Sequence, residues 1–300
     1  MCEGETRAST ARYARDILAL QDGLNFRSLL AVPRHDVAYY ARRPTGLVTL
    51  GLRTDQMSKR YLLGLQGFRL AQYLQLGWVC QDTIAARGLF CEPVHGLRNS
   101  DLHLVTVSPG GEILGYLGLV GSADEVPRLL HDPDRARFPV ETAHGINLFD
   151  VVPRSQATRT DQVGELKRFV HRRSMSDRML RLRVTLELLL AAGSLVLGHP
   201  DLQLVVGDVE EHVALRHLML VGLQVRLIEG TTPQLRPGDY LHLAYVRRGA
   251  VKPFVAQVPA REELAARMRR LDRVLSAEDL GLAVRELIGR GSGTISRVAA

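Results

Sequence analysis

Lysine, cysteine and aromatic residues are all scarce in this 300-residue chain. Only three of its 39 basic residues are lysine, and the rest are arginine. Such a skew follows most often from a GC-rich genome, so the formal net charge of +7 says little about partners. The arginines are spread along the whole chain, and no basic run alternates with aromatic residues, which make up 5% of it. We therefore expect no nucleic-acid partner.

The three cysteines, Cys2, Cys80 and Cys91, are odd in number and lack the spacing of metal ligands. This usage is typical of a reducing compartment. The first ten residues are polar, so we expect no secretory signal there. Apolar runs such as residues 186–197 are interrupted by charged and small residues and are too short to span a bilayer. The sequence predicts a cytoplasmic protein without a transmembrane segment or a metal site.

What the chain does have is a regular alternation of strand-like and helix-like segments. Hydrophobic residues make up 46% of it, enough for a sizeable core. Strand patterns cover residues 47–52, 101–107, 112–120, 163–170, 202–206, 223–228 and 240–246. Helix patterns cover residues 10–21, 56–76, 179–197, 208–222 and 260–289. This order predicts an α/β fold with three layers and a mixed central sheet.

The same patterns divide the chain into three parts. Residues 45–250 are expected to form the α/β domain, after an N-terminal extension over residues 1–44 and before a C-terminal helical extension over residues 251–300. Within the domain, Asp208 is expected to be the N-cap of a helix, with Glu211 completing a capping box.

Two charged residues, Glu165 and Arg168, lie three apart in the strand pattern of residues 163–170. Charges in a core strand are costly unless they are paired or used. On a regular strand, residues three apart point to opposite faces, so these two share a site only if the strand carries a bulge. Without a bulge they are two unrelated, partly exposed charges, and the sequence leaves both interpretations open.

Three short motifs stand in a fixed order along the chain. Residues 69–78 hold an Arg, an aromatic residue four positions later and a terminal Leu-Gly-Trp. Residues 110–119 form a glycine-rich hairpin, and residues 165–169 match a Glu-x-x-Arg-Phe strand motif. Together they resemble the acyl-homoserine-lactone synthase branch of the GNAT superfamily and the related N-acyl amino acid synthases. The resemblance covers roughly residues 45–230.

The resemblance implies a GNAT-like acyltransferase. Such an enzyme moves an acyl group, here a fatty one, from acyl-carrier protein or acyl-CoA to the amine of an amino acid or a related small molecule. Acyl-CoA or acyl-pantetheine would be a co-substrate, with no tightly bound cofactor. In this fold two strands splay apart and the acyl-pantetheine lies in the gap. Glu165 would accept the proton of the amine, and Arg168 would hold an acidic side chain or the carboxylate of the acceptor.

Further residues are expected around that gap. Backbone N–H groups near Phe169 and Val170 would polarise the thioester carbonyl. Arg172, Arg173 and Ser174 would bind the pantetheine phosphate or an acidic carrier, and a solvated turn fits the same residues equally well. The acceptor or acyl pocket is expected to include Arg69, Tyr73, Trp78, Glu92, His95 and Phe149. The two aromatic residues of residues 69–78 also fit a structural core.

A second hypothesis is a GNAT-like domain that has lost its chemistry and binds an acyl ligand or a protein. Gly118 stands where the hairpin of the family carries an arginine, and long helices flank the domain. Other chemistries have little support, because the sequence contains neither a Gly-x-Ser-x-Gly elbow nor a phosphate-binding P-loop.

Overall fold

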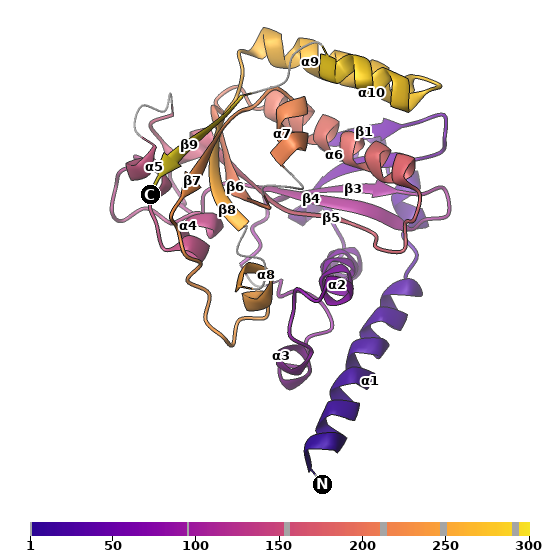
Figure 1. The fold of residues 1–300 in the computed structure, drawn as a ribbon. Coiled ribbons are helices and arrows are strands. Elements are labelled where there is room, and N and C mark those ends of the chain that lie inside the picture. Colours follow the sequence, from indigo (N-terminus) through magenta and orange to yellow (C-terminus); the bar gives the residue numbers. More distant parts are fainter. Residues whose placement is uncertain (1, 95, 153–156, 211–214, 247–250, 290–293) are drawn as a thin grey trace.

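The computed structural model describes residues 2–94, 96–152, 157–210, 215–246, 251–289 and 294–300. Within these residues, nine strands form one mixed sheet in the order β1-β2-β3-β4-β5-β6-β8-β7-β9 (Figure 1). The strands are β1 (Tyr39–Arg42), β2 (Val48–Arg53), β3 (Leu102–Val107), β4 (Ile113–Val120), β5 (Val163–His171), β6 (Leu204–Glu210), β7 (Gln224–Glu229), β8 (Val251–Gln257) and β9 (Ile295–Ala299). The β5–β6 and β7–β9 pairs are parallel, and the other neighbours are antiparallel.

Helices cover both faces of the sheet (Figure 1). One face carries α6 (Arg178–Gly198) and α7 (Leu215–Leu220), with α9 (Arg261–Ser276) and α10 (Leu280–Gly289) packed outside α6. The other face carries α1 (Cys2–Asp22), α2 (Lys59–Leu76), α3 (Gln81–Ala86), α4 (Pro139–His144), α5 (Leu148–Val151) and α8 (His242–Val246). Short 3-10 turns lie at Arg27–Ala31, Arg34–Asp36, Thr54–Gln56 and Thr160–Gln162. No described helix combines the length and the apolar character needed to cross a membrane.

The mixed α/β fold class is confirmed, with helices at both ends of the chain. The strong sequence patterns become β2, β3, β4, β5, β7, α2 and α6, each within a few residues of its expected limits. The end of α2 shows how a single residue in the sequence predicts where a helix ends. Gly77 adopts a φ of +67°, which glycine reaches without steric cost, and its N–H donates to the last carbonyls of the helix.

Two expectations on the second half of the sheet are wrong. Asp208 lies inside β6 and caps no helix, while Glu211 lies outside the described residues. Residues 240–246 form no strand, because the Asp239 carboxylate accepts the Leu241 N–H and begins the turn that leads into α8.

The sequence patterns do not predict the central strand β8. It lies between β6 and β7, yet Lys252 and Pro253 interrupt its apolar run, and a proline argues against a central strand. Residues 251–300 therefore supply two strands, β8 and β9, besides the expected helices. Since β1 joins the opposite edge, the sheet extends past residues 45–250 on both sides.

A buried ionic network connects α6 and α9 to the end of the edge strand β1. Arg43, just after β1, donates from Nε and Nη2 to the Glu187 carboxylate at 2.6 and 3.1 Å. Its Nη1 donates to Asp272 of α9 at 2.7 Å. The Glu187 side chain is fully buried, so it depends on Arg43 to compensate its lost hydration.

We expect the substitution Glu187→Ala to lower the free energy of unfolding by about 3–5 kcal/mol, because it leaves the Arg43 guanidinium buried beside a cavity. Urea unfolding measures this change. The control is Asp55→Ala, which removes a solvent-exposed pair with Arg53 and should cost less than about 1 kcal/mol. Equal effects of the two substitutions would contradict the role given to the buried pair.

Candidate active site

β5 carries one extra residue relative to its neighbour, and that residue is Arg168. Between Gly118 and Tyr116, β4 advances two residues while β5 advances three. Arg168 is the additional residue of this bulge. Its φ is +63°, a left-handed conformation that is uncommon for a residue with a Cβ atom. The bulge breaks the alternation of the strand, so Glu165, Lys167 and Arg168 all line one cavity. The condition for a site shared by Glu165 and Arg168 is therefore met.

β5 and β6 pair only where they begin. Residues 163–165 align with residues 204–206, and beyond them β5 continues along β4 while β6 continues along β8. Gly207 stands at this fork. A Cβ atom there would lie 2.5 Å from the Leu166 carbonyl oxygen, so the close approach of the two strands requires glycine.

A small cavity of about 150 Å³ lies in the gap that opens beyond the fork. Tyr73 and Trp78 form part of its wall, with their rings stacked at a centroid distance of 5.5 Å. Phe169 of β5 and Asp208 of β6 contribute from the two diverging strands. The lining is therefore largely aromatic and aliphatic, with charged groups from the two strands.

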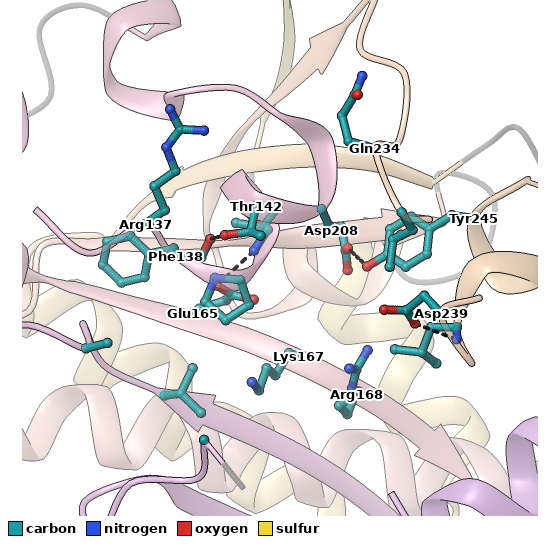
Figure 2. A pocket seen from close by; sticks show the side chains of 18 of the residues that line it. Arg137, Phe138, Thr142, Glu165, Lys167, Arg168, Asp208, Gln234, Asp239 and Tyr245 are labelled. Carbon is teal, nitrogen blue, oxygen red and sulfur yellow. Dashed lines mark hydrogen bonds between the residues drawn. The ribbon is translucent and has the colours of Figure 1, made fainter. Parts of the chain in front are cut away.

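A larger cavity of about 700 Å³ lies on the side of the sheet that carries α4 and α8 (Figure 2). Figure 2 shows Lys167 and Arg168 projecting into it from β5, with Tyr245 and Asp208 facing each other at its side. The two cavities share the residues Arg168, Asp208, Leu241 and Tyr245. These four side chains stand between the gap in the sheet and the larger cavity.

Glu92 is the centre of a buried ionic network beside the bulge. Its carboxylate accepts hydrogen bonds from Nε and Nη2 of Arg69 at 2.9 and 2.7 Å, and from the Tyr240 hydroxyl at 2.8 Å. The Arg168 Nε lies 3.4 Å from Glu92 Oε2, an ion pair without the geometry of a hydrogen bond. Burial alone would raise the pKa of Glu92, but the Arg69 and Arg168 guanidinium groups lower it below its usual value.

Arg69 also extends the network toward β3. Its Nη1 donates to the Tyr116 hydroxyl at 3.2 Å, and that hydroxyl is 2.8 Å from Nδ1 of His103. Burial, helped by the nearby Arg69 and Lys167, lowers the pKa of His103 to about 3. His103 is therefore neutral at physiological pH and acts as a hydrogen-bonding partner.

Glu165 lies at the inner end of the larger cavity. One carboxylate oxygen, Oε2, accepts the N–H of Val140 in the first turn of α4 at 3.2 Å. Burial raises the pKa of Glu165 to about 8, and the charge of Asp208 adds to the increase. Burial and the nearby Arg168 lower the pKa of Lys167. With its raised pKa, the Glu165 carboxyl group can take up and release a proton near neutral pH.

Asp208 and Tyr245 form a second polar contact across the cavities. The Tyr245 hydroxyl donates to Asp208 Oδ2, and Nε2 of His144 lies 4.0 Å from the same oxygen. Asp208, Tyr240 and Tyr245 are not among the expected site residues, because the sequence patterns predict a helix from residue 208 and a strand over residues 240–246. Asp208 interrupts an apolar strand just as Glu165 does, and this pattern would have been enough to predict Asp208 as a site residue.

The structure brings most of the expected acceptor-pocket residues together. Arg69, Tyr73, Trp78 and Glu92 surround the bulge and the small cavity. Phe149 lies elsewhere, in the core behind the wall of the larger cavity, where its ring centroid is 6.1 Å from that of Phe138. His95 lies outside the described residues.

The loop expected to bind the donor lies away from both cavities. Val170 of β5 buries its side chain in the core on the α2 side. Arg172 pairs with Asp22 at 3.2 Å and donates to the Ser174 hydroxyl. The side chains of Arg173 and Ser174 are exposed to solvent. None of these residues lines the two cavities, so a role in donor binding stays a prediction for them.

No protein-family model and no curated protein sequence matches the chain. Similar solved structures include the acyl-homoserine-lactone synthase LasI, with a TM-score of 0.45 and 16% identity over 74% of this chain and 94% of that one. TofI, crystallised with an inhibitor and MTA, gives 0.44 and 16% over 74% and 96%. MesI, a CoA-dependent acyl-homoserine lactone synthase, gives 0.39 and 18% over 70% and 87%.

LasI and MesI are synthases of the kind that the three sequence motifs resemble. At these identities and TM-scores the likeness assigns no activity by itself.

The raised pKa of Glu165 predicts a pH-dependent stability. Between the usual pKa of a glutamate and about 8, the folded protein holds a proton that the unfolded chain has lost, so stability falls as pH rises through this window. The variant Glu165→Gln lacks this proton equilibrium. We expect urea unfolding at several pH values in the window to show the wild type losing stability relative to the variant. Parallel profiles for the two proteins would contradict a buried, titrating Glu165.

Proposed function

We propose that this protein is an N-acyltransferase. It moves a fatty acyl group from acyl-carrier protein or acyl-CoA to the amine of an amino acid or a related small molecule. The observation that carries the proposal is the fork between β5 and β6, with a buried, titratable Glu165 at its base. Attack of an amine on a thioester requires a place for the thioester, a proton acceptor and close contact between the two reactants.

The gap between the diverging strands suits the thioester donor. Beyond residues 165 and 206, β5 and β6 no longer hydrogen-bond to each other, so backbone groups at the gap are available to pantetheine amides. The aromatic lining of the small cavity, from Tyr73, Trp78 and Phe169, suits an acyl chain. An open gap supports binding of an acyl ligand, and the titratable Glu165 beside it supports an enzyme over an inactive acyl-binding domain.

The larger cavity suits the amine acceptor. Glu165 takes a proton from the amine while the new N–C bond forms, the C–S bond breaks and the thiolate leaves to be protonated as a thiol. Arg168 is already engaged by Glu92, so of its two expected roles the pairing with an acidic side chain of the protein fits better. Its function is then to stabilise the bulge in β5 where the two cavities meet.

The direct test is release of thiol. The protein is incubated with acyl donors from acetyl to palmitoyl, as CoA and as carrier-protein thioesters, together with a library of amines. We expect thiol release that requires both donor and amine, with an N-acyl product of the matching mass. The absence of thiol release with every donor and every amine would refute the proposal.

The residue assignments predict the behaviour of two variants. Glu165→Gln should lower the turnover number by about 10²-fold or more, within the range of a general base, while the fold is retained. Arg168→Lys should also lower it, because a planar fork is replaced by a point charge. Steady-state kinetics and thermal unfolding are measured together, with Asp55→Asn as the exposed control. If both variants keep near wild-type turnover and Arg168→Lys only lowers the melting temperature, the two residues are structural.

A further inference from the structure

Arginine side chains gather around the larger cavity. Arg98 lies beside Gly121, just after β4, and Arg137 lies just before α4. Arg87 and Arg236 belong to segments that flank Tyr240. Figure 2 shows the Arg137 side chain extending away from Glu165. The exposed guanidinium groups thus lie at the outer part of the cavity, whereas Glu165 is 3% exposed at its inner end.

Within the described residues, three of these arginines have no carboxylate partner. Among the residues that the structure describes, the side chains of Arg87, Arg137 and Arg236 make neither a hydrogen bond nor an ion pair with an acidic residue. Arg87 lies over the Tyr240 ring, 5.9 Å from its centroid. Guanidinium groups that line a cavity without partners create a positive potential that attracts anions.

Three carboxylates that line the cavity accept hydrogen bonds from neutral groups of the protein. Asp239 accepts the Leu241 N–H at 2.8 Å, and Asp101 accepts the Arg98 N–H at 3.0 Å. Asp208 is bound by the Tyr245 hydroxyl. The cavity is lined by six arginine and lysine residues and by four aspartate and glutamate residues, so basic side chains are in excess.

We propose that the acceptor is an amine that carries a phosphate or carboxylate group remote from its reacting nitrogen. Arg137 and Arg236 bind this anion at the outer part of the cavity, while the amine reaches inward to Glu165. A guanidinium binds both kinds of anion through two parallel hydrogen bonds. The cavity volume of about 700 Å³ accommodates a small metabolite that reaches from these arginines to Glu165. The inference rests on the proposed function, in which this cavity receives the acceptor.

Matched acceptor pairs test the inference. With one acyl donor, O-phosphoethanolamine is compared with ethanolamine, and glutamate with glutamine, so that phosphate and carboxylate are tested separately. We expect a preference of about tenfold or more in kcat/KM for at least one anionic member, the size given by one lost charge-assisted hydrogen bond. Arg137→Gln and Arg236→Gln should each reduce that preference through KM. Arg269→Gln, an exposed arginine of α9 on the other face of the sheet, should keep it.

Anion binding gives a readout that does not depend on turnover. At constant ionic strength, inorganic phosphate and pyrophosphate should raise the melting temperature of the wild type and of Arg269→Gln more than that of an Arg137→Gln/Arg236→Gln double variant. An equal shift in all three proteins would overturn the inference.

The kinetic outcomes separate the inference from the proposed function. Thiol release with equal kcat/KM for charged and neutral acceptors would overturn the anionic acceptor and leave the acyltransferase standing. A rise in the KM of the acyl donor alone would assign the arginines to donor phosphates and also overturn it. Absence of thiol release with every amine would instead refute the proposed function, and the acceptor assignment with it.

Discussion

The buried carboxylate of Glu92 is the interaction on which the candidate site depends. It binds Arg69 of α2, the Tyr240 hydroxyl before α8 and the guanidinium of Arg168 in β5. A buried charge without partners costs several kcal/mol, so these three parts of the chain are held at one point. The left-handed backbone of Arg168 costs on the order of 1–3 kcal/mol, and its ion pair with Glu92 offsets part of that cost.

The bulge connects this network to the chemistry. By adding one residue to β5, it places Arg168 in the same cavity as Glu165 and Lys167. Gly207 allows the close approach of β6 at the point where the two strands diverge. The gap in the sheet and the larger cavity meet at this point. Two reactants that enter from the two cavities would meet beside a carboxyl group whose pKa lies near neutral pH.

The sequence predicts the fold better than the site. Long apolar periodicities and Gly77 mark α2, α6 and the strands up to β5, whereas Pro253 hides β8 and the β-type residues of α8 resemble a strand. The contact between Glu165 and Arg168 is conditional in the sequence, because the bulge uses an arginine where a glycine would have signalled it. Tyr240 and Tyr245 reach the site only through the tertiary arrangement of α8, which no local pattern encodes.

The central claim is that the gap between β5 and β6 receives the acyl donor. A crystal structure with a non-hydrolysable acyl-pantetheine analogue tests it most directly. We expect the pantetheine arm between the two strands, with its amides bonded to backbone groups beyond Glu165 and Gly207 and the acyl carbonyl near Phe169. An analogue bound elsewhere, with the gap empty or the two strands paired along their length, would contradict the account.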